Sequence, residues 1–130
     1  EMDALFPLVE TALAVTTAKR IGFFPFGHFA ESIAARFHQR EQCTLFAYDN
    51  YNRCHSKAAK LTVQPPARIR NDALDCLVIL TPVVATMERL VVQATQVFGV
   101  PRERILTLAD LFAWHFTASE RDATTGKSAT

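Results

Sequence analysis

The sequence predicts an α/β fold: a small three-layer sandwich around a mostly parallel sheet of four to five strands, with an extra N-terminal helix. Two observations lead to this prediction. Several short, continuously apolar runs have the length of strands that are buried on both faces. These runs alternate with longer segments of helical periodicity, which favours parallel strands joined by right-handed crossovers.

The composition is typical of one globular domain. A chain of 130 residues with 49% hydrophobic and 21% charged residues is large enough for a single core. The formal net charge of +1 favours neither nucleic acid nor an anionic membrane as a partner. No apolar run is long enough to span a bilayer. Three scattered cysteines cannot form a closed disulfide set, so we expect a cytoplasmic location.

The two ends of the chain differ in pattern. Residues 3–18 have helical periodicity after a possible N-cap at Asp3 and predict a leading helix. The segment 119–130 is rich in Ser, Thr and Ala, and we expect a flexible tail or linker after a single domain at 1–118. The first residues lack the basic leader of a secretory signal. From Glu1 at the start we expect either a piece of a longer protein or a residue left over from expression.

The first half of the domain predicts a strand–helix–strand unit. The β-branched and aromatic run Ile21–Phe24 is typical of a buried strand, and Pro25–Gly27 ends it. Helical periodicity follows from His28 to Arg40. A second apolar run, Thr44–Tyr48, predicts the next strand and ends at Asp49.

The second half repeats the alternation after a polar and basic segment at 50–60. The patterns predict a short edge strand, a buried strand, a helix with a C-cap glycine, a strand and a final short helix: Leu61–Val63, Cys76–Leu80, Val84–Phe98 before Gly99, Ile105–Leu108 and Ala109–Phe116. This order of elements is typical of a Rossmann-like fold.

The predicted topology also predicts where a ligand binds. In such sheets the ligand lies outside the carboxyl ends of the strands, where the strand order reverses. Three segments converge at that edge, and they supply the candidate binding residues: Phe26, Gly27, His28 and Phe29 after the first strand, Asp49 and Asn50 after the second, and Thr81 and Pro82 after the buried strand of the second half.

The turn after the first strand is close to the dinucleotide fingerprint G-x-G-x-x-G/A, with Pro25 in place of the first glycine. Gly27 lets the backbone approach a phosphate, Ala30 allows close packing, and the helix N-terminus attracts an anion. Asp49 follows about 20 residues later at a strand end, where an acidic side chain hydrogen-bonds a ribose hydroxyl. The proline removes the tight-turn glycine, so the loop must take another path.

A family resemblance lies in the blocks FFPFGHFAESIAARF, CTLFAYDNYN, LTVQPPARI, LDCLVILTP and VFGVPRERILTLADLF. These blocks, which fall within residues 19–112, resemble the Rossmann-like nucleotide-binding module attached to sugar-processing methyltransferases and polysaccharide-biosynthesis enzymes. The resemblance implies an accessory domain that binds NAD(P) or a nucleotide-sugar-like ligand inside a larger protein, or that only acts as a scaffold.

Other hypotheses compete with nucleotide binding. Four phenylalanines lie close to Pro25 in the sequence, and their rings could fill the crevice: Phe23, Phe24, Phe26 and Phe29. The second hypothesis is therefore a degenerate Rossmann-like domain that binds no nucleotide and serves as a protein-interaction or dimerisation platform. Asp49 is also a residue type that starts turns. A receiver-like domain with Asp49 as phosphoacceptor is a third hypothesis, but the first strand end lacks the acidic residues that would hold Mg²⁺.

The remaining motifs favour structural interpretations. No nucleophile elbow or carboxylate pair occurs, so we expect a module that is not catalytic on its own. Cys54-His55 lacks a second ligand pair at metal spacing, and Gly126-Lys127-Ser128 lacks the other glycine of a phosphate loop. One basic segment is either a contact for the extra phosphate of NADP or, the interpretation that we favour, a solvated loop: Arg53, His55, Lys57 and Lys60.

Overall fold

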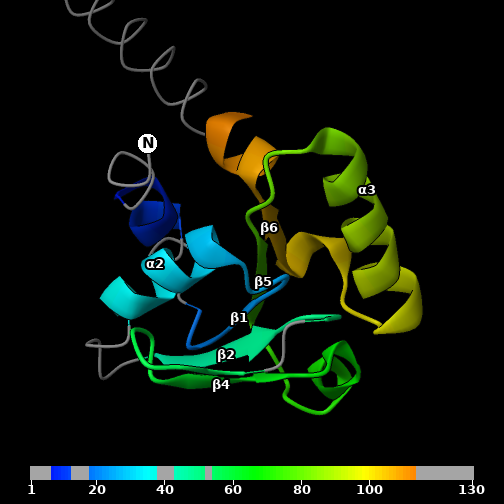
Figure 1. Cartoon of the computed structure of the whole chain (residues 1–130). Helices are drawn as coiled ribbons and strands as arrows, with labels where there is room; N and C mark the ends of the chain where they lie inside the picture. The colour runs from blue at the N-terminus through cyan, green and yellow to red at the C-terminus, as the bar shows by residue number, and fades with distance from the viewer. Residues whose placement is uncertain (1–6, 13–17, 38–42, 52–53, 114–130) are drawn as a thin grey trace, which may run out of the picture.

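The computed structural model describes residues 7–12, 18–37, 43–51 and 54–113. Its sheet has six strands in the order β3-β4-β2-β1-β5-β6 (Figure 1). All neighbouring strands are parallel except β3 and β4. The α/β class and the mostly parallel sheet are therefore confirmed. The strands are β1 (Arg20–Phe23), β2 (Thr44–Tyr48), β3 (His55–Ser56), β4 (Leu61–Gln64), β5 (Cys76–Ile79) and β6 (Ile105–Thr107).

The prediction of four to five strands is wrong, because the short strand β3 brings the number to six. This strand lies inside the segment that the sequence predicts to be a loop, and it pairs antiparallel with β4, His55 opposite Thr62. Two polar residues at a sheet edge carry no apolar run, so periodicity gives no signal for them. As a consequence, β4 is not an edge strand, because β3 covers one side of it and β2 the other.

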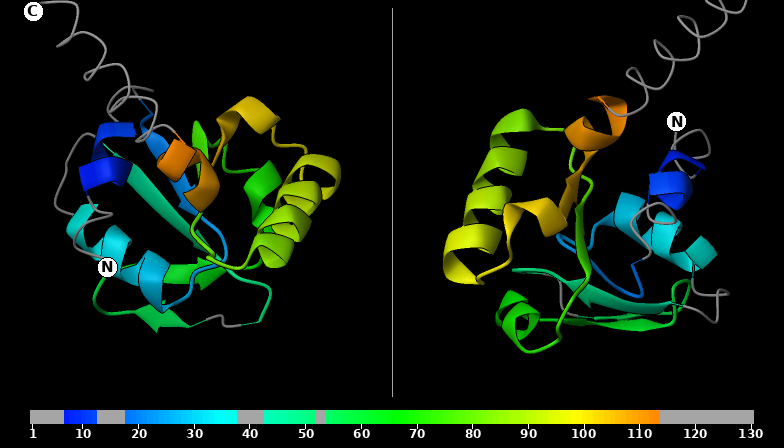
Figure 2. Two further views of the ribbon diagram at one scale, coloured as in Figure 1. Left: turned by 90° about the horizontal axis from the view of Figure 1, so that it is seen from above. Right: turned by 180° about the vertical axis from the view of Figure 1, so that it is seen from behind.

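The strand order reverses at the centre of the sheet. The chain moves from β1 to β2 through helix α2 (His28–Phe37), and from β5 to β6 through helix α3 (Val84–Val92), in opposite directions along the sheet. Figure 2 shows α2 and α3 on opposite faces of the sheet. The loop after β1 and the loop after β5 therefore diverge, which opens a crevice at the carboxyl ends of these strands.

Two apolar clusters form the core, one on each face of the sheet. The α2 face includes residues from the helical segments 7–12 and 108–113, and the α3 face includes the 3-10 helix η1 (Pro66–Arg70) and the π-helical turn η2 (Gln93–Val97). The fully buried members of the first cluster are Val9, Ile21, Phe23, Ala34, Ala59 and Leu111. Those of the second cluster are Phe24, Tyr48, Leu77, Ile79 and Ala94.

Gly22 in β1 is required by close packing on the α3 face. A Cβ atom there would lie 2.6 Å from Leu74 Cδ1 and 2.8 Å from Tyr48 Cε2, well inside the contact distance of two carbon atoms. The residues that create this constraint are distant in sequence, so the sequence gives no indication of it.

The predicted boundaries hold only in part. The helix expected at 84–98 is α-helical to Val92 and then widens into η2, after which Gly99 adopts a φ of +70° as a C-cap glycine does. Of the helices predicted at 3–18 and 109–116, the structure describes helical residues 7–12 and 108–113. The tail at 119–130 lies outside the described residues.

No helix in the described part of the chain is both long and apolar enough to cross a membrane.

Candidate functional site

A cavity of about 720 Å³ opens at the carboxyl edge of the sheet, at the crevice that the strand order creates. Its volume lies within the usual range for small-molecule sites. Three segments line it: the β1–α2 loop, the turn after β2, and one face of α3 with its continuation. The lining residues are Pro25, Gly27, Asp49, Asn50, Tyr51, Thr86, Arg89, Leu90 and Gln93.

Gly27 lies in this wall immediately before α2. A Cβ atom at Gly27 would meet nothing within 4 Å, and its backbone does not have a positive φ. The fold itself therefore does not require glycine at this position. Glu31 N–H donates to the Gly27 carbonyl at 2.9 Å, which closes the first turn of α2. The N–H groups of a first helical turn have no acceptor within the helix, so the Gly27 side of the cavity is suited to an anion.

The phenylalanines around Pro25 do not fill the cavity. Phe23 and Phe26 pack into the cluster on the α2 face, with ring centroids 6.5 Å apart, whereas Phe24 packs against Phe98 on the α3 face at 6.3 Å. Phe29 is half-buried against the α2-face cluster. None of these four rings lines the larger cavity, so the main structural objection to a ligand in the crevice is removed.

Asp49 forms a turn and also contributes to the cavity wall. Its Oδ1 accepts the N–H of Tyr51 at 2.8 Å, which is the hydrogen bond of an Asx turn. The same residue lines the cavity, although it is only 5% exposed. Its backbone N–H donates to the Gln64 carbonyl at 3.1 Å, which extends the pairing of β2 with β4 and fixes where the carboxylate lies.

The wall contributed by α3 is absent from the sequence-based prediction. Thr86, Arg89 and Gln93 lie on one helical face, and Gln93 Nε2 donates to Asn50 Oδ1 at 3.3 Å across the cavity. Arg89 Nη2 lies 3.5 Å from Thr86 Oγ1. Thr86, Arg89 and Gln93 are three and four residues apart, so the sequence already places them on one face of the helix that follows β5. Among the lining residues, Arg89 is the cation and Asp49 the carboxylate.

The other predicted site residues lie apart from this cavity. Thr81 and Pro82 follow β5 but are not among the residues that line the cavity. Phe26 and His28 line a smaller cavity of about 220 Å³, which shares Gly27 with the larger one. Phe29 lines neither of these two cavities.

The smaller cavity carries an acidic group at the first turn of α2. Glu31 Oε2 accepts the Ser56 hydroxyl at 2.6 Å, and Glu31 Oε1 lies 4.0 Å from Nδ1 of His28, whose side chain is 87% exposed. A carboxylate beside the helix N-terminus repels an anion on that side. An anion would therefore approach the first turn from the larger cavity, next to Gly27.

The described members of the basic segment after β2, which are His55, Lys57 and Lys60, do not line the larger cavity. Lys57 and Lys60 are exposed in the turn between β3 and β4, and His55 Nδ1 is 2.9 Å from Thr62 Oγ1. Arg53 lies outside the described residues. Within the described ranges, no group of three or more His, Cys, Asp or Glu residues is arranged to hold a metal ion.

Two ionisable side chains, Tyr48 and Cys76, are buried in the core and have raised pKa values. Burial, and then a 2.6 Å hydrogen bond to Asp72, raise the pKa of Tyr48 well above its usual range. Burial between the strands raises the pKa of the Cys76 thiol to about 12. Neither residue lines the cavity at the carboxyl edge.

Comparison of the chain with protein-family models, with curated proteins and with solved structures finds no match.

Proposed function

We propose that this domain is a nucleotide-binding accessory module of a larger biosynthetic protein, with the ligand's phosphates at the Gly27 helix start and its ribose at Asp49. The observation that carries the proposal is the cavity itself. It lies at the reversal of strand order and brings Gly27 and Asp49 into one wall. Without the antiparallel β3, the order β4-β2-β1-β5-β6 agrees with the strand order expected of a Rossmann-like sheet, which supports the proposal.

The charges of the lining indicate the ligand class. A carboxylate at the end of β2 accepts hydrogen bonds from vicinal hydroxyls, and a helix start together with Arg89 attracts phosphate. NAD and nucleotide sugars carry both groups. Asp49 repels the additional phosphate of NADP, and the basic turn at Lys57 and Lys60 does not line the cavity to compensate. We therefore expect NAD or a nucleotide sugar to bind more tightly than NADP.

A thermal-shift panel with NAD, NADP and nucleotide sugars tests the proposal. A ligand at about 100 times its dissociation constant adds roughly 2.7 kcal/mol of stability, which raises the melting temperature by several degrees. A panel without any shift contradicts nucleotide binding.

Variants of Asp49 and Gly27 then test whether the ligand binds in this cavity. Asp49→Asn keeps an oxygen for the Asx turn but loses the charge, so we expect the affinity to fall by about 5- to 100-fold. Gly27→Val places methyl groups in open space and should block the ligand while the fold remains. Glu103→Gln, at an exposed site that does not line the cavity, is the matched control. Equal affinity in all three variants would rule out this site.

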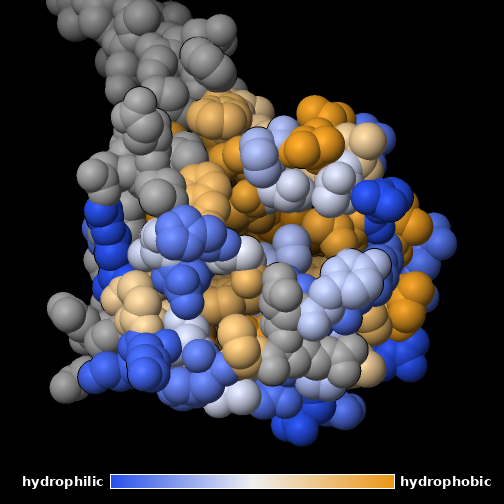
Figure 3. Space-filling view, viewed as in Figure 1, coloured by the Kyte–Doolittle hydropathy of each residue, from blue (hydrophilic) through white to orange (hydrophobic). Residues whose placement is uncertain are grey.

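A second candidate function is a protein-interaction or dimerisation platform. It is favoured by apolar side chains on the α3 side of the molecule, where Figure 3 shows orange surface patches. Val83, Val84, Val92 and Val97 are each at least half exposed. If the panel shows no ligand, dilution of the protein tests this function, because a self-associating platform dissociates as its concentration falls.

A further inference from the structure

The smaller cavity adjoins the position that we assign to the phosphates. It has a volume of about 220 Å³, and Gly27 lines both cavities, so a ligand with its phosphates at Gly27 reaches the border of the smaller one. The nucleotide-binding proposal assigns no part of a ligand to this second space. Its other lining residues are Phe26, His28, Glu31, Cys54, Ser56 and Val63.

Strand β3, which periodicity does not predict, contributes to this cavity. Cys54 precedes β3, Ser56 lies in it, and Val63 lies in β4, the strand that pairs with it. The Ser56 hydroxyl donates to Glu31 Oε2 at 2.6 Å and accepts the N–H of Ala59 at 3.1 Å. Because Ser56 is only 4% exposed, this contact fixes the Glu31 carboxylate between α2 and β3. The antiparallel addition to the sheet thus completes a second compartment beside the start of α2.

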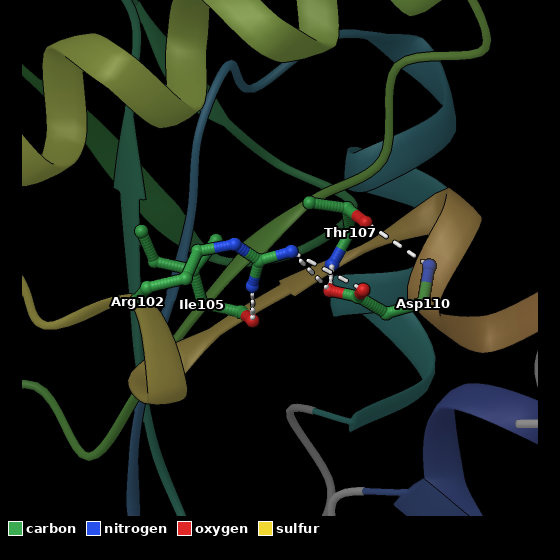
Figure 4. Close-up of polar contacts among 4 residues, drawn as sticks. All are labelled: Arg102, Ile105, Thr107 and Asp110. Atoms are coloured by element: carbon green, nitrogen blue, oxygen red, sulfur yellow. Dashed lines mark hydrogen bonds and ion pairs between the residues drawn. The ribbon is translucent and has the colours of Figure 1, made fainter. Parts of the chain in front are cut away.

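Glu31 has the surroundings of a binding residue, in contrast to a carboxylate with a structural role. Arg102 Nη2 donates to both carboxylate oxygens of Asp110 at 3.2 and 3.1 Å, and the Thr107 N–H donates to Asp110 Oδ2 at 3.0 Å (Figure 4). Glu31 instead lines a cavity, and its side-chain partners in the described part of the chain are the neutral Ser56 hydroxyl and His28 at 4.0 Å. A carboxylate has about four lone-pair sites, so Glu31 can accept further hydrogen bonds from a group in the cavity.

The lining suits a neutral group with several hydroxyls. The negative charge of Glu31 disfavours a phosphate here, whereas its oxygens accept the hydrogen of a hydroxyl. The imidazole of His28, whose side chain is 87% exposed, adds a nitrogen that can donate or accept. Phe26 and Val63 supply the apolar wall that small-molecule sites combine with a few polar groups. A sugar ring has the matching chemistry, with hydroxyls at its rim and C–H groups on its faces.

The size of the cavity indicates a single ring. Its volume of about 220 Å³ is below the roughly 300–1,000 Å³ of complete small-molecule sites, so it suits one part of a ligand whose remainder lies in the larger cavity. The sugar of a nucleotide sugar is one ring attached to the outer phosphate. The corresponding half of NAD has two rings, a second ribose and the nicotinamide.

We propose that the ligand is a nucleoside diphosphate sugar, and that its sugar occupies the smaller cavity with hydroxyls bound to Glu31 and His28. This inference rests on the proposed nucleotide site and narrows its ligand from NAD or a nucleotide sugar to a nucleotide sugar. The two proposals are tested separately, because a nucleoside diphosphate alone needs the larger cavity and only the sugar needs the smaller one.

Calorimetric titration with matched pairs of ligands tests the assignment of the sugar. The diphosphates of adenosine, cytidine, guanosine, thymidine and uridine are each titrated alone and as the glucose ester, with NAD for comparison. We expect the glucose ester of the preferred diphosphate to bind about tenfold or more tightly than the diphosphate itself, because hydrogen bonds to a charged group are added. Glu31→Ala should remove this difference without weakening the binding of the diphosphate alone. Glu103→Ala loses the same charge at an exposed residue that lines neither cavity, and it should keep the difference.

Alkylation of Cys54 measures occupation of the smaller cavity without any substitution. Cys54 is the exposed cysteine of the three, whereas Cys43 is half-buried and Cys76 is buried. At saturating concentrations the glucose ester should suppress the reaction of Cys54 with iodoacetamide, and the diphosphate alone should leave most of it. Should Glu31→Ala fail to fold, Glu31→Gln, which keeps an oxygen for Ser56 but loses the charge, is used together with this measurement.

The possible results distinguish the two proposals. The sugar proposal is overturned if the glucose ester binds no more tightly than its diphosphate, if folded Glu31→Ala keeps the difference, or if Cys54 stays reactive in the saturated complex. Tighter binding of NAD than of every glucose ester also overturns it. In each of these cases the nucleotide site remains. If none of the ligands binds, the nucleotide site itself is refuted, and the sugar proposal with it.

Discussion

Gly22→Ala should destabilise the protein through one specific steric conflict. The added methyl group would lie 2.6 Å from Leu74 Cδ1, 2.8 Å from Tyr48 Cε2 and 3.3 Å from Leu77 Cδ1. Carbon atoms in contact prefer separations of about 3.5–4.0 Å, so Leu74 and Tyr48 would each have to move by roughly 1 Å. Both side chains are buried, with exposures of 5% and 0%.

The Tyr48 ring has little freedom to move, because its hydroxyl donates to Asp72 Oδ2 at 2.6 Å. Overpacking of this kind costs about 1–3 kcal/mol. The loss of glycine's freedom in the unfolded chain returns about 0.4–1 kcal/mol. We therefore expect Gly22→Ala to lower the free energy of unfolding by about 1–2 kcal/mol, and the melting temperature by roughly 3–8 °C.

Gly27→Ala is the matched control, because its methyl group would meet nothing within 4 Å and its backbone φ is not positive. Urea unfolding and thermal melting of both variants give the comparison. In a Tyr48→Phe background, Gly22→Ala should cost less, because the ring is no longer held by Asp72. Equal stability of Gly22→Ala and Gly27→Ala would refute the steric reasoning.

Three other changes have outcomes that follow from single contacts. The raised pKa of Cys76, about 12 in the folded protein against 9.0 unperturbed, means that its stabilising contribution is complete below pH 9 and lost as the pH rises towards 12. Between pH 9 and 10 the wild type should lose about 1 kcal/mol more than Cys76→Ala in urea titrations, and parallel losses contradict this. The backbone N–H groups of Arg20 and Lys19 donate to Asp75 and lower its pKa. The stability that the Asp75 carboxylate contributes is therefore present at neutral pH and lost as the pH falls below about 4. Asp75→Asn should reduce the loss of stability at acidic pH, and an unchanged loss would contradict this prediction. Gly99→Ala should lower the free energy of unfolding, followed by thermal melting, by about 1 kcal/mol, because the φ at Gly99 is +70° and an alanine is strained there. Unchanged stability would contradict this prediction and would mean that the backbone at this C-cap changes its conformation to fit alanine.

The elements that the sequence predicts well are those whose local pattern and tertiary environment agree. The runs at β1, β2 and β5 are apolar because both faces of the sheet are covered by helices, and their alternation with helical segments predicts the parallel pairing. Strand β3 is polar, and only its pairing with β4 makes it a strand. The constraint on Gly22 likewise comes from side chains at positions 48, 74 and 77, and no local pattern contains this information.

The candidate site is predictable to the extent that it follows from topology. Gly27 and Asp49 meet because the loops after neighbouring parallel strands end at the same edge of the sheet. Thr81 and Pro82 are expected there by the same rule but do not line the cavity, and the chain after β5 contributes Thr86, Arg89 and Leu90 of α3 instead. The rule predicts where strands end, whereas the direction of the chain after each strand depends on packing.

The β1–α2 loop shows why counting fingerprint glycines is a weak test of a ligand site. Pro25 stands in place of the first glycine, with phenylalanines on both sides of it, and one of the competing hypotheses is that these rings fill the crevice. In the structure, Phe23 and Phe26 pack on one face of the sheet and Phe24 on the other. The residues between them, Pro25 and Gly27, remain in the cavity wall. The large rings therefore anchor the loop from both faces, and the space beside α2 depends on where this loop directs its side chains rather than on how many glycines it contains.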